Sequence, residues 1–422
     1  MFINDFENSF IENGASTYEF GDLSLFLLLY ADDLVFFSES VEGLQSLLNC
    51  LCDYTKRWKL TVNTEKTKIV VFRNGGIIKE SESWTYDGNG ISVVDEFCYL
   101  GVLLRFNNKF KTTIKHVASQ ARKAVFALRA KCNQVNFNIK TLLHLFDTYI
   151  VSILHYACET WAGFKADEVE KVHLEFCKNI LCVKKSTCNA MVYYELGRFP
   201  LVNQQIFKAF KYWFKLLNSN NCILKEIYQF FFKETEKVLP KHNFLVFIKQ
   251  KLSELGLGYI WLRQSPADII LLPLIKQRID DQAKQLLLAS ISTSSKCDLF
   301  RYLVDDVTLQ FYLTKSLSKQ RRISVSKLRL SAHNLAIETG RYRKVERNNR
   351  LCRNCELFEI EDEYHFLFIC PKFSDIRRKY IKNYFWVKPS VYKVIELLNT
   401  HNIKDLNLLG KYIIEANNSR IT

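Results

Sequence analysis

Short apolar runs separated by turn-forming residues fill the first hundred positions, and this pattern predicts β-strands. The first runs are Leu23–Tyr30 and Leu34–Phe37, and Lys68–Phe72 is rich in β-branched residues. Turn sequences divide the remaining runs, and "DGNG" at 87–90 is a strong hairpin signal. These remaining strands are expected at Trp84–Tyr86, Ile91–Val94 and Phe97–Leu104.

The stretch "SVEGLQSLLNCLCDYTKRW" (40–58) interrupts the strands with a helical period. Its apolar positions are Val41, Leu44, Leu47, Leu48 and Leu51. Strand, helix, strand and hairpins together predict an α+β fold, with an antiparallel sheet and a helix over residues 1–105.

From about residue 106 the pattern becomes helical. In "KTTIKHVASQARKAVFALRAKC" (111–132) one face is apolar and another is a basic stripe of Lys111, Lys115, Arg122 and Arg129. The next helix, Thr141–Cys158, is apolar nearly all round, so we expect it to be central. Helical periods continue through Val169–Leu181, Ile206–Leu217 and residues 222–320, with breaks at "NSNN" (218–221) and "STSS" (292–295).

Composition narrows the class of partner. The chain has 422 residues, a hydrophobic share of 48% and a formal net charge of +15, which favours a polyanionic partner. A membrane surface is the rival polyanion, but the sequence shows no basic amphipathic anchor. The 13 cysteines are scattered through a long chain, which indicates a reducing compartment rather than a disulfide framework. No apolar run is long enough to span a bilayer and no signal peptide is evident, so we expect a nuclear or cytoplasmic protein.

Asp32 and Asp33 stand side by side within the apolar stretch "SLFLLLYADDLVFFSES" (24–40). In mid-strand they would point to opposite faces, and at least one charge would be buried. At the tip of a tight hairpin both can project from one end. The two anions repel each other, but a divalent cation would make the arrangement favourable, and carboxylate oxygens are ligands that magnesium prefers. The alternative is an acidic turn without a metal.

The tetrad Tyr30-Ala31-Asp32-Asp33 within an apolar hairpin resembles the catalytic motif of reverse transcriptases. Other segments, in the same order, resemble non-LTR (LINE-type) retrotransposon enzymes. "WKLTVNTEKTKIVVF" (58–72) is similar to the next palm motif, and "FCYLGVLL" (97–104) to the primer-grip strand. "HYACETW" (155–161) and "KSTCNAMVYYELGRFPL" (185–201) are similar to segments that follow the thumb.

The resemblance implies RNA-directed DNA polymerisation by two magnesium ions, with RNA template, DNA primer and deoxynucleoside triphosphates as partners. By the family pattern Asp32 is the main magnesium ligand and Asp33 supports it. Tyr30 would lie under the primer terminus, and Lys66 would contact the triphosphate; alternatively Lys66 is a solvated lysine. The primer grip would comprise Phe97, Tyr99 and Gly101, which also suit a core strand.

The same resemblance suggests how the chain is divided. Residues 1–105 would form a partial palm, 106–220 a helical thumb and post-thumb region, 221–320 a helical connection, and 321–422 a basic segment with a zinc knuckle. In the family a third carboxylate comes from a palm strand well upstream of the hairpin, whereas only 29 residues precede Tyr30. Neither Asp5 nor Asp22 suits that role, so we expect this polypeptide alone to be inactive or nearly so.

Four metal-ligating side chains near the C-terminus follow the spacing C-x2-C-x9-H-x4-C. They are Cys352, Cys355, His365 and Cys370. Zinc takes four N or S ligands in a tetrahedron, so the spacing predicts a closed structural zinc site, with "DEYHFLFIC" as a short helix that Pro371 ends. Many LINE proteins carry a Cys-Cys-His-Cys knuckle after the polymerase domain. The alternative is a set of unrelated thiols and a surface histidine.

Basic residues flank this cluster. Between residues 321 and 350 nine basic residues oppose two acidic ones, whereas the loop of the cluster is itself acidic. We therefore expect phosphate contact from the basic positions and folding from the zinc. The candidate nucleic-acid contacts are Lys115, Arg122, Arg129, Arg341, Arg343, Lys344 and Arg347. Three readings remain open: a polymerase fragment, an RNA- or DNA-binding remnant without catalysis, and the product of a decayed element.

Overall fold

The computed structural model describes residues 5–12, 18–20, 23–132, 135, 137–238, 241, 243–315 and 317–420. These residues form a mixed α+β molecule that divides into two compact units. Unit 1 comprises 1–117, 157–166 and 205–275, and unit 2 comprises 118–156, 167–204 and 276–422. Asp22 lies outside the described residues.

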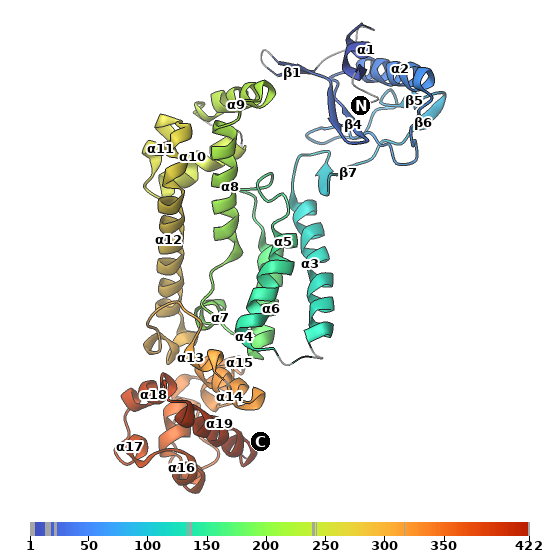
Figure 1. Cartoon of the computed structure of the whole chain (residues 1–422). Helices are drawn as coiled ribbons and strands as arrows, with labels where there is room; N and C mark the ends of the chain where they lie inside the picture. Colours follow the sequence, from blue (N-terminus) through green and yellow to red (C-terminus); the bar gives the residue numbers. More distant parts are fainter. Residues whose placement is uncertain are drawn as a thin grey trace. The chain divides into compact units, whose positions relative to one another are not determined.

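Antiparallel hairpins and two helices form the N-terminal part of unit 1 (Figure 1). The helices are α1 (Phe6–Glu12) and α2 (Val41–Trp58). The strands pair in order as β1 (Tyr18–Phe20) with β2 (Leu23–Leu25), β3 (Leu27–Tyr30) with β4 (Asp33–Phe36), β5 (Trp84–Tyr86) with β6 (Asn89–Ile91), and β7 (Glu96–Tyr99) with β8 (Val102–Arg105).

Helix α2 organises the core of this part. Its predicted apolar stripe is confirmed, because Leu47, Leu48 and Leu51 are buried together with aromatic side chains such as Phe10 and Trp84. Ser40 caps the helix by accepting a hydrogen bond from the Gly43 backbone N–H at 3.0 Å. The β3–β4 and β5–β6 hairpins therefore share a core with the helix, and the hairpin that carries Asp32 and Asp33 starts from a packed base.

Four strand predictions differ from the structure. The predicted strand Leu23–Tyr30 is divided at Phe26 into β2 and β3, and of Ile91–Val94 only Ile91 lies in a strand. Residues 97–104 form a hairpin rather than one strand, because Leu100 and Gly101 adopt φ values of 46° and 78° and reverse the chain. Lys68–Phe72 forms no strand, and only Ile69 makes a bridge, to Val93.

Residues 205–275 of unit 1 are mainly helical, as predicted. They contain part of α8 (Leu201–Leu217), followed by α9 (Cys222–Thr235), α10 (Phe244–Glu254), α11 (Gly258–Arg263) and the 3-10 turn η2 (Pro266–Leu271). Trp213 and Trp261 stack with ring centroids 5.9 Å apart and tie α8 to α11. The expected breaks at 218–221 and after Thr293 are confirmed.

Unit 2 begins within α3 (Lys111–Cys132), whose bounds match the predicted segment. The predicted helix over 141–158 is divided into α4 (Ile139–Leu145), the π-helical turn η1 (Phe146–Ile150) and α5 (Val151–Leu154), and it ends before Cys158. The segment is also less central than predicted, because one of its apolar side chains, Tyr149, is exposed. Helices α6 (Asp167–Leu181), α7 (Asn189–Glu195) and α12 (Leu272–Thr293) follow.

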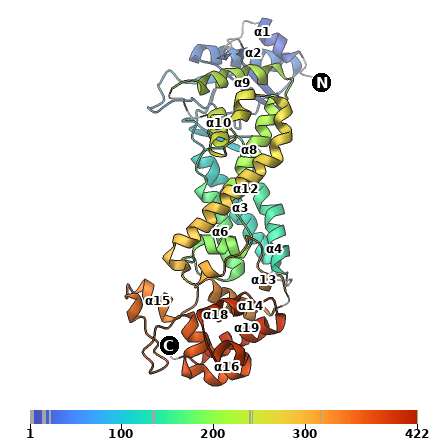
Figure 2. The same ribbon diagram turned by 90° about the vertical axis from the view of Figure 1, so that its left-hand side faces the viewer.

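The C-terminal part of unit 2 is a cluster of helices, of which α14, α16, α18 and α19 gather together in Figure 2. The helices are α13 (Phe311–Thr314), α14 (Lys319–Arg329), α15 (Ala336–Tyr342), α16 (Ser374–Tyr380), α17 (Asn383–Trp386), α18 (Val391–Leu398) and α19 (Ile403–Asn418). The π-helical turn η6 (His365–Ile369) lies within the predicted short helix.

Candidate functional site

The predicted strand–turn–strand at the aspartate pair is confirmed. Strands β3 and β4 pair from Leu27 with Phe36 up to Tyr30 with Asp33, which leaves Ala31 and Asp32 as the two-residue turn. Ala31 has a φ of 55°, a left-handed conformation that costs an alanine about 1 kcal/mol. Backbone strain of this kind is retained where the surrounding structure fixes it, and it concentrates at functional turns.

Both aspartates project from this tip. Asp32, Asp33 and the neighbouring Tyr30 are exposed, and Tyr30 is 61% exposed. Within the described part of the chain, no side chain donates a hydrogen bond to either carboxylate and none forms an ion pair with it. Carboxylate oxygens are thus available at the tip as metal ligands. Strand β3, which leads to the tip, is less buried than expected, because Leu28 and Leu29 are 38% and 45% exposed.

The β7–β8 hairpin brings one predicted primer-grip residue close to the aspartates. Burial raises the pKa of the Tyr99 hydroxyl, and the nearby Asp33 carboxylate raises it further. Tyr99 pairs with Val102 across the turn formed by Leu100 and Gly101. Phe97 is half-buried on the same strand. The hairpin therefore places a phenol, an apolar ring and an exposed glycine turn in the neighbourhood of the acidic tip.

Lys66 occupies an exposed turn rather than a strand. Its backbone N–H donates to Asn63 Oδ1 at 3.0 Å, and in the described residues no partner engages its ammonium group. Lys68, in contrast, donates to Ser92 Oγ at 3.2 Å. Of these two lysines, Lys66 has the freer side chain.

A third carboxylate does not accompany Asp32 and Asp33 among the described residues, where the one group of three or more clustered metal-ligating side chains is the Cys/His group near the C-terminus. Asp5 is engaged elsewhere, because it accepts a hydrogen bond from Tyr54 Oη at 2.8 Å. Burial and this bond raise the pKa of Tyr54 to about 12. Magnesium at the hairpin tip would thus have two carboxylates from this part of the chain.

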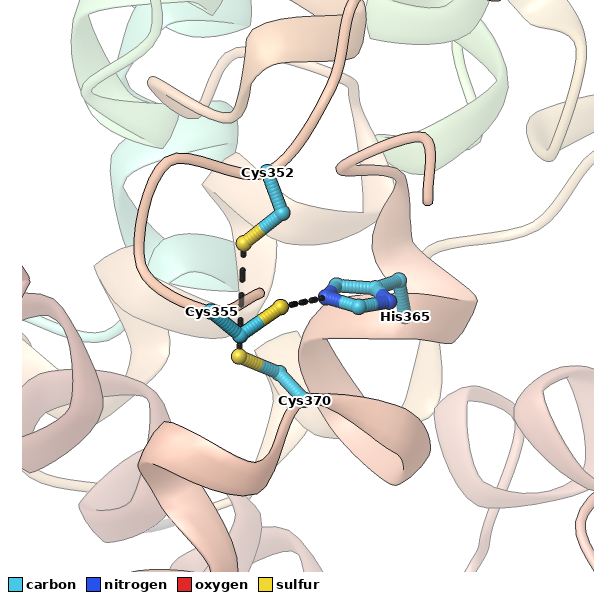
Figure 3. A group of neighbouring side chains, drawn as sticks. All are labelled: Cys352, Cys355, His365 and Cys370. Carbon is cyan, nitrogen blue, oxygen red and sulfur yellow. Dashed lines mark hydrogen bonds between the residues drawn. The ribbon is translucent and has the colours of Figure 1, made fainter. Parts of the chain in front are cut away.

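The predicted C-terminal ligands do come together (Figure 3). One ligand atom from each of Cys352, Cys355, His365 and Cys370 lies within 4.8 Å of the others. The Cys352 and Cys370 sulfurs are 4.0 Å apart, and Cys355 Sγ lies 3.4 Å from His365 Nε2. A zinc ion bonded at about 2.3 Å to sulfur separates its ligands by roughly 3.8 Å, so the four side chains fit a tetrahedral ion with small adjustments.

Neighbouring groups orient these ligands, and the sequence pattern did not predict them. Glu359 Oε2 lies 3.0 Å from His365 Nδ1, which directs Nε2 toward the sulfurs. The Cys370 carbonyl accepts a hydrogen bond from Arg377 at 2.8 Å. The sequence showed the acidic loop but gave no sign that one of its glutamates pairs with the histidine.

The candidate nucleic-acid contacts differ in how free they are. In unit 2, Arg122 pairs with Glu168 at 3.6 Å and with Glu175 at 3.4 Å. Arg129 has its Nε buried, with no hydrogen-bond partner among the described residues. Lys115, on the part of α3 in unit 1, is exposed.

The basic side chains of the segment before the Cys/His group also differ, because some form ion pairs and others face solvent. Arg341 and Arg347 both pair with Asp298, and Arg341 also binds Glu338 at 2.9 Å. Arg343 and Lys344 are exposed. A run of basic residues in the sequence therefore supplies both intramolecular ion pairs and cations that face solvent.

Comparison with known proteins identifies the N-terminal part. Residues 1–104 match the family model of reverse transcriptase (RNA-dependent DNA polymerase). A search of curated proteins gave no match. The matched residues include the hairpin with Asp32 and Asp33, Lys66 and the predicted primer grip, so the relation of this region to reverse transcriptases is confirmed. Across the described residues, no helix is both long and apolar enough to cross a bilayer.

Proposed function

We propose that the chain is the palm-to-C-terminal part of a non-LTR (LINE-type) retrotransposon reverse transcriptase, an RNA-directed DNA polymerase. One observation carries the proposal: within a region that matches reverse transcriptases, two exposed carboxylates project from a strained hairpin tip beside Tyr99. Two neighbouring carboxylates that have no hydrogen-bond donor or ion-pair partner among the described residues are suited to a divalent cation.

Magnesium held at this site would activate the primer 3′-hydroxyl and stabilise the departing pyrophosphate. Asp32 and Asp33 would hold it, with Asp32 as the main ligand. Tyr30, exposed on the strand that leads into the turn, would support the primer terminus, and Lys66 would contact the triphosphate. Phe97, Tyr99 and Gly101 would position the primer. The RNA template, DNA primer and deoxynucleoside triphosphates are the proposed partners.

Metal capture at the tip can be tested without polymerase activity. Iron(II) replaces magnesium at carboxylate sites and, with ascorbate and peroxide, cleaves the nearby backbone. We expect cleavage around residues 30–34 that excess Mg²⁺ suppresses and that Asp32→Asn abolishes. Asp87→Asn, at the turn of the β5–β6 hairpin, is the matched control and should leave the cleavage unchanged. Cleavage spread evenly over the chain, or retained in Asp32→Asn, would remove the basis for the proposal.

A second proposal concerns activity. Two carboxylates meet part of the requirement of a two-metal polymerase site, and the described residues add no third one beside them. We propose that this polypeptide alone extends primers weakly or not at all. Robust Mg²⁺-dependent extension of an RNA-templated primer by the purified chain would refute this. The same observation favours the alternative function, a nucleic-acid-binding remnant without catalysis.

At the C-terminal group, the fit of three sulfurs and one imidazole nitrogen supports a structural Zn²⁺ rather than a catalytic one, since all four positions are supplied by protein. Exposed cations before the group, such as Arg343 and Lys344, would contact phosphates. In this proposal the zinc stabilises the local fold and the basic residues provide the affinity.

A further inference from the structure

A groove lies beside the Cys/His group, within unit 2. It has a volume of about 780 Å³ and is bordered by α14, α15, the loop that follows α15 and the end of α19. Leu351 and Asn354, from the loop that carries Cys352 and Cys355, form part of its wall, and so does Phe366 from η6. The groove and the Cys/His group therefore share one structural element.

The wall of the groove is strongly basic. Six cationic side chains contribute to it: Lys184, Lys327, Arg343, Arg350, Arg353 and Arg420. The acidic residue in the wall is Glu361, and Arg420 neutralises it through contacts of 2.7 and 2.8 Å. A concave surface lined by one sign of charge concentrates its field, so the groove is suited to an anion.

Some of these cationic side chains hold the protein together, and others are available to bind a ligand. Arg350 donates to the carbonyls of Val345 and Ile337, at 2.8 to 3.0 Å, and holds the loop against α15. Lys327, Arg343 and Arg353 are exposed, and none of their charged groups has a partner among the described residues. Three side chains are therefore available to neutralise phosphates.

Amide and apolar groups complete the wall. Asn349, Asn417 and Asn418 are exposed and offer both donors and acceptors, which can read base edges. Ile323, Val345 and Ile414 supply apolar surface beside them. The volume is that of a small-molecule pocket, about 300–1,000 Å³, which is too small for a duplex but accommodates a few unpaired nucleotides.

We propose that this groove binds a short single-stranded nucleic-acid segment, with its phosphates on Lys327, Arg343 and Arg353 and its bases against the amides. The proposal rests on the proposed function only in that the chain acts on nucleic acids. It concerns a surface of unit 2 and does not depend on the Asp32 hairpin in unit 1.

The test measures binding of the full chain to fluorescent 12-nucleotide RNA and DNA single strands and to a blunt duplex, by anisotropy over a range of salt concentrations. Lys327→Ala, Arg343→Ala and Arg353→Ala, combined in one variant, should weaken single-strand affinity by about tenfold or more. The slope of log affinity against log salt should fall by about 2, because each lost phosphate contact removes about 0.7. Comparison of RNA with DNA strands shows whether the 2′-hydroxyl contributes.

The matched control changes three exposed lysines of the same unit that do not line the groove, Lys388, Lys404 and Lys411, to alanine. It removes the same net charge and should leave the affinity and the salt slope nearly unchanged. An equal loss of single-strand affinity in both triple variants would overturn the groove as the binding site. The binding would then reflect only the net positive charge of the chain. Duplex binding that falls as much as single-strand binding would overturn the choice of ligand. Asp32→Asn separates the two proposals. It should abolish iron cleavage at the hairpin and leave single-strand affinity unchanged, so failure at one site leaves the test of the other intact.

Discussion

Arg329 shows how a residue's charge in the sequence differs from its role in the fold. It belongs to the basic segment, yet its side chain is 1% exposed and lies against Glu195, which is fully buried. Its Nε donates to Glu195 Oε1 at 2.7 Å, and its other nitrogens reach the Leu398 carbonyl and Asn399. Sequence spacing gave the charge but not the partner, because Glu195 is 134 positions away.

Removal of one member of this buried pair should be costly. Arg329→Met leaves the Glu195 carboxylate buried without its partner, and we expect a loss of about 3–5 kcal/mol in the free energy of unfolding, measured with urea. Arg378→Met, at a side chain that is 70% exposed, should change stability by less than about 0.5 kcal/mol. Addition of Glu195→Leu to Arg329→Met should recover part of the loss. A loss for Arg329→Met no larger than the control would contradict this assignment.

Cys188 differs chemically from an ordinary thiol. A hydrogen bond from Cys297 lowers its pKa, and the backbone N–H groups of Met191 and Ala190 and the charge of Lys296 lower it further. Because the thiolate is then present at neutral pH, its alkylation rate should be nearly constant from pH 6 to 8. A thiol with an ordinary pKa of about 8.5 reacts about tenfold faster per pH unit.

Peptide mapping after timed iodoacetamide treatment measures this rate at Cys188 alone. Cys297→Ala removes the hydrogen-bond donor and should restore a pH dependence to the rate. If wild-type Cys188 already shows the ordinary tenfold increase, the thiolate is not stabilised.

At the scale of elements, the sequence predicted most of the helices and the hairpin at the aspartates but missed turns whose residues are unusual. The two-residue turn at 100–101 needs positive φ at both positions, and leucine at the first is a poor signal for it. The continuous apolar run therefore predicted one strand. Likewise, nothing in the apolar pattern of 141–158 predicted the π-helical turn at Phe146–Ile150, because that turn depends on tertiary packing. Glu359 beside His365 was missed for the same kind of reason.

Gly197, after α7, joins two distant elements by close backbone approach. Leu196 forms a bridge with Leu309, and a Cβ atom on Gly197 would lie 2.4 Å from the Leu309 backbone nitrogen. Gly197→Ala should therefore cost about 1–3 kcal/mol beyond the backbone strain at its φ of 62°.

Gly256→Ala isolates that strain, because Gly256 has a φ of 71° and no atom within 4 Å of an added Cβ. We expect it to cost only about 1 kcal/mol. Urea midpoints of the two variants provide the comparison. Equal urea midpoints would show that the backbone around the Leu196–Leu309 bridge can shift to accept the added Cβ without loss of stability.

At the scale of the whole molecule, the two units are interleaved along the chain, with helices α3, α8 and α12 running from one to the other. The division into four consecutive segments that the sequence suggested stays a prediction. The candidate sites nevertheless lie in different units: the acidic hairpin tip belongs to unit 1, and the Cys/His group and the basic groove belong to unit 2. Hard oxygen ligands and soft sulfur ligands should thus select different metals.

This distribution predicts that zinc loss affects unit 2 and spares the aspartate hairpin. The Cys/His loop is tied to the rest of unit 2 by the Arg420–Glu361 pair and by the Ile337 N–H bonded to the Glu361 carbonyl at 3.1 Å, so its release should loosen the α15 region as well. We expect one zinc per chain by elemental mass spectrometry, and less than a tenth of that in a Cys355→Ser, Cys370→Ser double variant. Cys98→Ser, Cys222→Ser is the control, since both thiols are exposed and outside the group.

In the zinc-depleted variant, proteolysis should increase between residues 336 and 370, while iron cleavage at 30–34 persists. Full zinc content in the double variant would show that these sulfurs do not hold the metal, and loss of the iron cleavage would show that the two metal sites depend on each other.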